Sequence, residues 1–539
     1  MWDPVAKRSK VQVVYNFGRE DAANREALAR LVASVTRFLE PDKALAAAGE
    51  GLEFTESRPL GGTWVLDGLW ARLGIGAVMR RLLKGRRLDA SAERVLFALV
   101  ANRALAPSSK LAASRWASED VLIEALPATT DDACYRAMDW LLQIKDPLEQ
   151  EIFTQVANLL NLEVDLLFFD TTSTYFELDA EDGPVVRDDR GNVAAAGEGQ
   201  KEAPFRAYGK SKDHRNDLPQ VVIGMAVTRD GIPVRVWCWP GNTADSALIR
   251  QVKDDMRDWT LSKIVWVADR GFASAENRRY LRKGDHHYII GEKLRSGSAE
   301  AKAALSRQGR YTDVAANLRV KEVRISEDER FVICYNPEGA ERDAAVRARM
   351  LTQLEEMIKD SDNRTKTKRA ELRGVISTKP GLNRYLRVTP GGLLRIDAKA
   401  VKAETNLDGK YLLRTSDPKL PAEDIALGYK QLLEVERGWR DLKQVIDLRP
   451  VYHRKEERIR AHVILCWLAL LLIRVAETTC HATWPALRRE LDRIAIGTFT
   501  GPAGTFWQRT EITKAQRDIL AQLKLDPPPR IYQLTPASP

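Results

Sequence analysis

Hydrophobic and polar positions follow two patterns along the chain, and the change near residue 160 predicts two kinds of structure. Before it, apolar residues recur every three or four positions, the spacing of amphipathic helices. After it, continuous apolar runs at 164–169 and 264–268 indicate strands buried on both faces of a sheet. Each run ends in an aspartate, Asp170 or Asp269. The pattern predicts an α/β core behind a helical N-terminal region, with carboxylates at strand ends.

Further elements of this core can be placed from the same pattern. Apolar segments 220–228 and 234–239 are joined by Arg229-Asp230-Gly231, and Asp-Gly favours a hairpin turn. A strand is predicted over 410–415, directly followed by a helix over 422–444. The apolar run 463–476 is interrupted by Arg474 and is shorter than the roughly 20 residues that span a bilayer. It predicts a buried helix, and we expect no membrane partner.

Residues 291–405 alternate short β segments with one charged helix and are predicted to form a β-rich insertion in the core. Within it, 364–387 carries eight basic residues and one acid, Glu371. This composition suits contact with a nucleic-acid backbone. The alternative is an ordinary solvated loop.

Composition excludes several classes of protein. The 539 residues include five cysteines, too few and too scattered for a disulfide scaffold or a Cys-x-x-Cys zinc site, which favours a reducing compartment. The 84 Lys and Arg residues exceed the 75 Asp and Glu residues, giving a net charge of +9 that points weakly to a polyanionic partner. A Walker-type phosphate loop is absent from the sequence, so ATP hydrolysis is not indicated.

The helix predicted over 422–444 carries chemically active residues. Successive steps of three or four residues predict a single stripe containing Tyr429, Leu432, Glu436, Arg440 and Lys443. A solvated face with an ordinary ion pair is the alternative. With Asp170 and Asp269, Glu436 gives three carboxylates from separate segments. Divalent cations such as Mg²⁺ prefer oxygen ligands, so these acids suggest a site for phosphoryl transfer.

Seven segments then occur in an order that is typical of one family. They are LLFFDTTSTYFE around Asp170, GKSKDHRNDLPQ at 209–220, PGNTADS at 240–246, VADRGFAS around Asp269, DGKYLLRT at 408–415, YKQLLEVERGWRDLK at 429–443 and RPVYHRKEERIRAHV at 449–463. The chain resembles the DDE transposases of bacterial insertion sequences, in the branch with a Tyr-x2-Arg-x3-Glu-x6-Lys signature helix.

The resemblance implies a fold and a division of the chain. An α/β, ribonuclease H-like catalytic core over 161–290 and 406–480 would be interrupted by the β-rich insertion 291–405. The helical N-terminal region 1–160 would be a DNA-binding region that reads terminal inverted repeats. The remaining residues, 481–539, would form a helical tail that contributes to dimerisation on DNA. The protein would work in the cytoplasm of a bacterium, at the nucleoid.

The resemblance also implies roles for residues. Asp170, Asp269 and Glu436 would be the catalytic metal ligands, holding two Mg²⁺ or Mn²⁺ ions. Tyr429 and Lys443 match signature positions that hold DNA, whereas Leu432 stands where the signature has arginine. We expect Arg440 or Arg437 to take over part of that contact.

A second set of residues is expected near the active site. The donors of the 209–220 segment would lie close to the acids, touching DNA or ordering the carboxylates, with a plain surface loop as the alternative. These donors are Lys210, Lys212, His214 and Arg215. Trp439 would either stack on an unpaired base or, as is commoner for tryptophan, be buried.

The implied reaction is cleavage of transposon ends to leave 3′-hydroxyls, followed by joining of these hydroxyls to target DNA. The sequence leaves open whether a hairpin intermediate intervenes. Two alternatives remain. One is a DNA-binding protein derived from a transposase that has lost catalysis. The other is a metal-dependent nuclease that does not join strands.

Overall fold

The computed structural model describes residues 53–84, 91–160, 165–194, 201–257, 259, 264–326, 330–449, 451–501 and 504–536, with short pieces before residue 40 that include β1 (Trp2–Asp3) and β2 (Arg8–Ser9). The chain forms two compact units. Unit 1 comprises 1–72, 89–134 and 476–539, and unit 2 comprises 73–88 and 135–475. Most of the helical prediction for the first 52 residues lies outside the described ranges.

Unit 1 combines helices with a four-stranded sheet of order β19-β18-β17-β3. Its strands are β3 (Glu53–Pro59), β17 (Ala495–Gly501), β18 (Gly504–Arg509) and β19 (Ile531–Pro536). Its helices include α3 (Gly61–Arg72), α5 (Ala92–Leu105), α6 (Lys110–Arg115), the π-helix η1 (Trp116–Asp120), α19 (Trp484–Leu491) and α20 (Lys514–Gln522).

The prediction of a purely helical tail over 481–539 is therefore wrong. Strand β17 pairs antiparallel with β3, and Phe499 lies opposite Phe54. Segments 495–501 and 504–509 are rich in aromatic and β-branched residues, which favour strands. Their partner β3 lies more than 400 residues away in the sequence, so no local pattern indicated the pairing.

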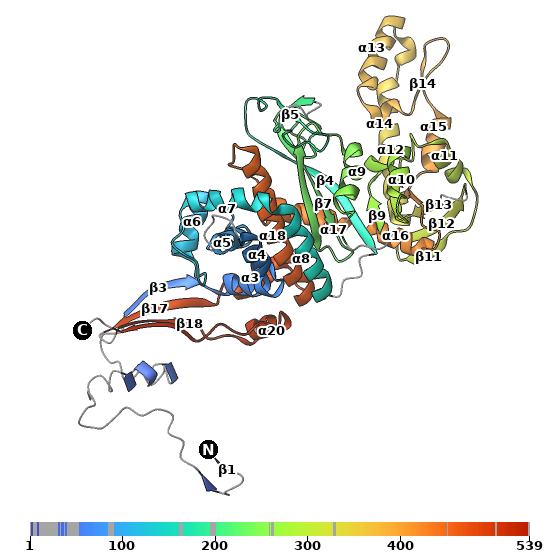
Figure 1. The fold of residues 1–539 in the computed structure, drawn as a ribbon. Coiled ribbons are helices and arrows are strands. Elements are labelled where there is room, and N and C mark those ends of the chain that lie inside the picture. The colour runs from blue at the N-terminus through green and yellow to red at the C-terminus, as the bar shows by residue number, and fades with distance from the viewer. Residues whose placement is uncertain are drawn as a thin grey trace, which may run out of the picture. The chain divides into compact units, whose positions relative to one another are not determined.

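Unit 2 is built on a nine-stranded mixed sheet of order β11-β12-β13-β16-β10-β9-β4-β7-β8 (Figure 1). In that order the strands are Thr312–Ala315, Leu318–Arg324, Arg330–Tyr335, Lys410–Thr415, His287–Glu292, Val265–Ala268, Leu166–Tyr175, Gln220–Val227 and Pro233–Pro240. Strand β9 is parallel to β4 and β10, and the other pairs are antiparallel. A separate small ladder joins β5 (Val185–Arg187) to β6 (Lys201–Ala203).

The central strands are buried on both faces, as their continuous apolar runs predict. Leu167 and Phe169 of β4 belong to a core filled from one face by three helices. These are α8 (Lys145–Leu160), α9 (Asp245–Asp255) and α10 (Ala275–Leu281). The predicted hairpin between β7 and β8 is confirmed, with Gly231 at φ +75° in the turn.

The opposite face of the sheet is covered by α16 (Ala422–Lys430) and α17 (Leu433–Gln444). Gly428 of α16 lies against the side chain of Leu166, and Gly438 of α17 lies against Met225. Successive side chains of a strand point to opposite faces of the sheet. Asp170 is four positions after Leu166 on β4, so its side chain lies on the face that α16 and α17 cover.

The single helix predicted over 422–444 is in fact two helices. Around Gln431 and Leu432 the backbone hydrogen bonds join residues three positions apart instead of four. The N–H of Leu432 donates to the Tyr429 oxygen at 3.0 Å, and the N–H of Glu434 donates to the Gln431 oxygen at 2.8 Å. Such tight bonds interrupt an α-helix. Tyr429 therefore lies on α16 while Glu436 lies on α17, and the predicted stripe is split.

The insertion is mixed rather than β-rich. Strands β11–β13 extend the sheet, but 337–405 is largely helical. Its elements are α12 (Pro337–Ile358), the 3-10 turn η3 (Ser361–Asn363), α13 (Lys366–Ser377), α14 (Pro380–Asn383), β14 (Leu386–Val388), β15 (Leu394–Ile396) and α15 (Ala398–Thr405). Helix α11 (Ala299–Ser306) precedes β11.

Helix α18 (Glu456–Cys480) contains the apolar run that predicted a buried helix. By length and composition it could cross a membrane, but 94% of its most apolar window is buried inside the protein. This burial agrees with a core helix. Two further helices, α4 (Ile75–Leu83) and α7 (Asp131–Gln143), precede α8.

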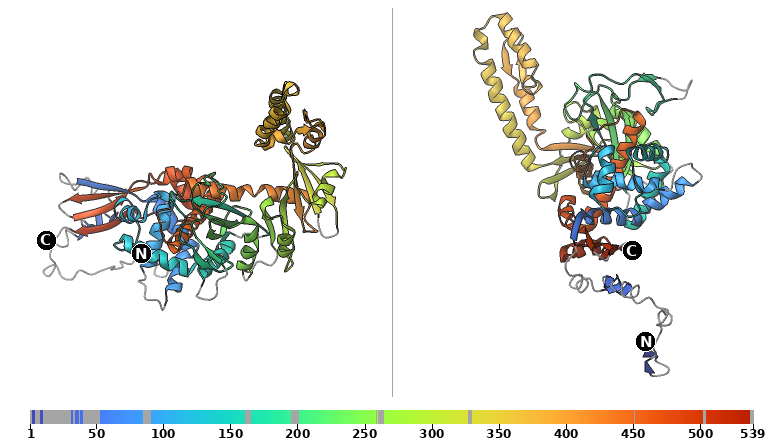
Figure 2. Two further views of the ribbon diagram at one scale, coloured as in Figure 1. Left: turned by 90° about the horizontal axis from the view of Figure 1, so that it is seen from above. Right: turned by 90° about the vertical axis from the view of Figure 1, so that its left-hand side faces the viewer.

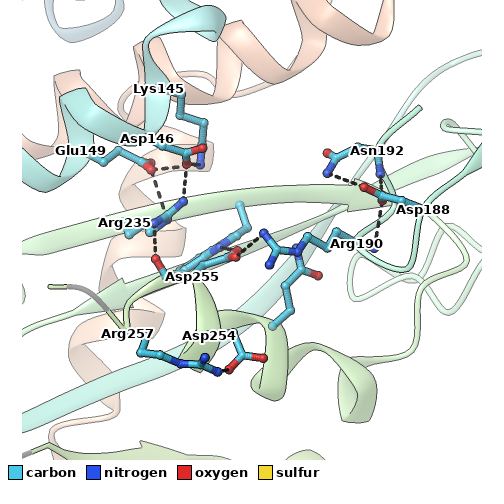
Figure 3. Close-up of polar contacts among 12 residues, drawn as sticks. Lys145, Asp146, Glu149, Asp188, Arg190, Asn192, Arg235, Asp254, Asp255 and Arg257 are labelled. Atoms are coloured by element: carbon cyan, nitrogen blue, oxygen red, sulfur yellow. Dashed lines mark hydrogen bonds and ion pairs between the residues drawn. The ribbon is translucent and has the colours of Figure 1, made fainter. Parts of the chain in front are cut away.

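A buried ion cluster fixes the edge of the sheet to α8 (Figure 3). The guanidinium of Arg235 on β8 is 6% exposed, pairs with Asp146, and lies 3.2 Å from the fully buried carboxylate of Glu149. It also donates to the backbone oxygen of Asp255 at the end of α9, at 2.7 Å. One cation thus connects β8, α8 and α9.

Candidate active site

Asp170 and Asp269 lie side by side on neighbouring parallel strands. Phe169 pairs with Ala268, the last residue of β9, and an aspartate follows each of these two residues in the sequence. Both residues are partly buried. Burial raises the pKa of Asp170, and the negative charges of Asp269 and Asp245 raise it further, while Lys212 opposes them. The strand register therefore places two of the three predicted acids next to each other.

An ammonium group compensates this negative charge. Lys212 Nζ lies 3.5 Å from Asp170 Oδ1 and 3.6 Å from Asp245 Oδ2, and donates to Thr171 Oγ1 at 2.7 Å. Thr171 Oγ1 in turn donates to Asp245 Oδ1 at 2.8 Å. Strand β9 ends at Ala268, so beyond Phe169 this edge of β4 is not paired with β9 and Lys212 can approach it.

Tyr429 contacts the second acid. Its hydroxyl donates to Asp269 Oδ1 at 3.2 Å, and burial together with Asp269 raises the pKa of the tyrosine, which keeps the donor protonated. A Cβ on Gly291 of β10 would lie 2.4 Å from this hydroxyl. A glycine at this position therefore leaves the space that Tyr429 occupies.

Glu436 lies on α17, and its side chain is exposed. The buried residues of this helix, Val435, Gly438, Trp439 and Leu442, orient it on β4 and β7. Across the described ranges, no three acidic, histidine or cysteine side chains are grouped closely enough to hold a metal ion. The structure thus brings together two of the three predicted ligands, and the convergence of Glu436 with them stays a prediction.

The other predicted DNA contacts fall into two groups. Lys443 Nζ lies 2.8 Å from Asp213 Oδ1, and Arg449 lies 3.2 Å from Asp213 Oδ2, so α17 is tied to the 209–217 loop. This loop also places Lys212, whose backbone N–H donates to Ser173 Oγ at 2.9 Å. The loop therefore lies beside Asp170, and its contact with DNA stays a prediction.

The remaining residues of these segments differ in exposure. Lys210, His214 and Arg440 are exposed, Arg215 pairs with Asp217 at 2.8 Å, and Arg437 lies 3.8 Å from Glu434. Trp439 is 6% exposed. Trp439 is therefore a core residue, and stacking on an unpaired base is not supported.

A groove of about 650 Å³ adjoins Lys443. Its lining combines basic and aromatic side chains with one acid, Glu177. The residues are Tyr175, Phe176, Glu177, Leu178, Arg206, Lys443, Arg449, Val451, Tyr452, His453 and Arg454. The guanidinium of Arg449 lies 4.6 Å from the ring centre of Tyr175, and Tyr452 is 67% exposed. Cations beside accessible aromatic faces are suited to nucleic acid.

Sequence reasoning missed Asp245, Gly291 and Arg449 as parts of this site. Asp245 lies in the quoted segment PGNTADS, which could have drawn attention to it. Arg449 likewise begins the segment RPVYHRKEERIRAHV. Gly291 has no local signal, because its importance comes from its contact with Tyr429.

Comparison with known proteins agrees with this geometry. A family model described as the transposase DDE domain matches residues 189–472, more than half of the chain. The chain belongs to the DDE transposase family. Asp269 and Glu436 fall inside the matched region, and Asp170 precedes it. The protein is thus a DDE-type transposase enzyme, and the family implies a ribonuclease H-like core and the use of divalent metal ions.

Curated proteins and solved structures were also compared with this chain. No curated protein matches the transposase. Among solved structures, it is similar to a piggyBac transposase synaptic complex with hairpin DNA, at 10% identity and a TM-score of 0.37, covering 80% of this chain and 77% of that one.

Proposed function

We propose that this DNA transposase binds the terminal inverted repeats of a bacterial insertion sequence, cleaves the ends and joins the 3′-hydroxyls to target DNA. The proposal includes membership of the signature-helix branch and action at the nucleoid. The observation that carries it is the register of Asp170 and Asp269 on neighbouring parallel strands, beside a lysine and a groove of basic and aromatic residues.

The donor set fits a hard divalent cation. Asp170 and Asp269 present carboxylate oxygens, the ligands that Mg²⁺ prefers, and the ammonium of Lys212 beside Asp170 indicates that this position attracts positive charge. We propose that these aspartates hold two Mg²⁺ or Mn²⁺ ions with Glu436 as the third ligand. When bound, such ions activate the attacking oxygen and stabilise the leaving one.

The chain's own residues orient the reacting groups. Tyr429 fixes one carboxylate oxygen of Asp269, which limits its rotation. Lys212 is held by Thr171 and Asp245 where it can neutralise Asp170 or a DNA phosphate. Lys443 and Arg449 are positioned by Asp213 at the groove, where they would contact the DNA backbone.

The signature position filled by Leu432 requires a substitute cation. We propose Arg440, which is exposed on the same helix as Glu436, or Arg437 in that role. Lys210, His214 and Arg215 would extend the contact along the 209–217 loop. Residues 1–160 would read the repeats, and 481–539 would contribute to a homodimer on DNA.

The proposal is tested with purified protein, labelled repeat-end DNA, a target plasmid and Mg²⁺. Joined products that require a free 3′-hydroxyl are expected, and EDTA should abolish them. Cleavage without joined products would instead indicate a metal-dependent nuclease. Repeat binding without any cleavage in Mg²⁺ or Mn²⁺ would indicate a DNA-binding protein derived from a transposase.

A further inference from the structure

Residues 337–405, called here the arm, form a self-contained unit between two strands of the sheet. Its own apolar core contains four buried side chains from separate parts of the arm. They are Leu354, Ile376, Leu382 and Tyr385. Helix α12 and the elements that pack on it project from the sheet of unit 2 (Figure 2). A separate core allows the arm to keep its shape without contacts to the rest of the sheet.

The root of the arm is fixed to the sheet. Strands β13 and β16, which lead into and out of it, pair directly, with Tyr335 opposite Lys410. The backbone N–H of Asn336 donates to the Gly409 oxygen at 2.8 Å, and Arg347 of α12 pairs with Asp408. The arm therefore has a defined position relative to the catalytic strands.

One stretch of the arm, 364–387, carries eight basic residues and a single acid, Glu371. Six exposed basic side chains form no ion pair with any described residue. They are Arg364, Lys366, Lys368, Arg373, Lys379 and Arg387. Within the same stretch Arg384 pairs with Glu404, and further along the arm Arg395 pairs with Asp362. An ordinary solvated helix face places acids near its bases, because like charges on neighbouring turns are destabilising.

We propose that this arm binds the phosphates of duplex DNA at a distance from the cleaved bond and independently of base sequence. The inference rests on the proposed function for the position of the cleaved bond. A duplex is a linear array of phosphates and matches exposed, flexible cations without requiring a pocket.

The strand order of the sheet gives the distance between the arm and the cleaved bond. Strand β13 is four strands from β4, which carries Asp170, and neighbouring strands are about 4.8 Å apart, so the root and the acid are separated by about 19 Å across the sheet. Helix α12 has 22 residues and extends about 33 Å further at about 1.5 Å per residue. At about 3.4 Å per base pair, the arm reaches DNA about 6 to 15 base pairs from the cleaved bond.

The test compares two triple variants of the full-length protein with equal loss of charge. The arm variant carries Lys366→Gln, Lys368→Gln and Arg373→Gln. The control carries Lys302→Gln, Arg307→Gln and Arg310→Gln, which are also exposed but lie outside the arm. Fluorescence anisotropy gives Kd for a 40-base-pair repeat-end duplex over a range of KCl concentrations.

We expect the slope of log Kd against log salt to fall by about 2 to 3 in the arm variant, about 0.9 for each lost phosphate contact, and to stay unchanged in the control. The difference from the wild type should disappear when the duplex extends less than about 6 base pairs from the cleaved bond. An unchanged slope in the arm variant, an equal fall in both variants, or a difference that persists on the shortest DNA would overturn the inference.

Failure of the proposed function has a different signature. If the protein never joins strands but the slope of log Kd against log salt falls only in the arm variant, the proposed function is wrong. The arm is then still a surface that binds long DNA duplexes. If the protein joins strands normally while both variants keep the wild-type slope, the proposed function holds and the arm does not bind DNA phosphates.

Discussion

The hydroxyl of Tyr429 donates a hydrogen bond to Asp269 across 160 positions of sequence, at 3.2 Å. The contact connects α16 to the end of β9 and depends on Gly291, whose missing side chain makes room for the tyrosine. It fixes the orientation of one of the two acids that the sheet brings together.

Tyr429→Phe should therefore lower the rate of DNA nicking while leaving DNA affinity nearly unchanged. Loss of an outer partner of a metal ligand typically costs about 10- to 100-fold in activity or metal affinity. The measurement is single-turnover nicking as a function of Mg²⁺ concentration. Tyr411→Phe is the control, because this neighbouring ring stacks on Tyr429 at 6.1 Å and its hydroxyl is near Cys334 instead. Equal rates for the two variants would contradict the role of Tyr429.

Asp245→Asn should release Lys212 from its position. The neutral amide keeps the size of the side chain but weakens its attraction for the ammonium, so we expect nicking to slow about tenfold with little change in the melting temperature. Asp254→Asn, on the same helix and paired with Arg257, is the control. If Asp245→Asn nicks as fast as the control, Asp245 has no positioning role.

Asp170 should reduce the stability of the metal-free protein at neutral pH. Burial raises its pKa in the folded state, so the folded protein binds the proton more tightly than the unfolded chain. Its contribution to stability is greatest at low pH and is lost as pH rises through the folded pKa. Asp170→Asn should therefore raise the melting temperature in EDTA at pH 7, and the gain should shrink towards pH 4.

The comparison for this prediction is Asp217→Asn, because pairing with Arg215 lowers the pKa of that exposed carboxyl. This variant should not gain stability at pH 7. Scanning calorimetry at several pH values separates the two directions. A lower melting temperature for Asp170→Asn at pH 7 would show that the buried charge is fully compensated.

Arg235→Ala should destabilise the protein strongly, because it leaves the buried carboxylate of Glu149 with one fewer cation at the junction shown in Figure 3. Removing one partner of a buried ion pair typically costs about 3–5 kcal/mol. Urea unfolding should show this loss, whereas Arg257→Ala, whose side chain is 70% exposed, should cost less than about 1 kcal/mol. Similar losses in both variants would mean that burial of Arg235 is unimportant.

The acidic strand ends could be predicted because the relevant signal is local. Continuous apolar runs indicate strands buried on both faces, and two aspartates that directly follow such runs meet when the strands are neighbours. The hairpin at Gly231 was predictable for the same reason, since its turn is specified by two adjacent residues.

Other features depend on contacts between distant segments. The break at Gln431 and Leu432 occurs within residues that favour helix, where α16 and α17 pack on different strands of the sheet. The pairing of β17 with β3 and the place of Lys212 between Asp170 and Asp245 likewise arise only in the folded chain. Local periodicity contains no information about such partners.

The central claim is that Asp170, Asp269 and Glu436 act together on a phosphodiester bond. The most direct measurement is Mg²⁺-dependent nicking of repeat-end DNA by Asp170→Asn, Asp269→Asn and Glu436→Gln, with gel-shift binding measured on the same preparations. Glu434→Gln, two residues away on α17 and paired with Arg437, is the control. We predict undetectable nicking by the three variants, near-normal DNA binding by all four and near-normal nicking by the control. Wild-type nicking by any of the three would remove that residue from the catalytic set.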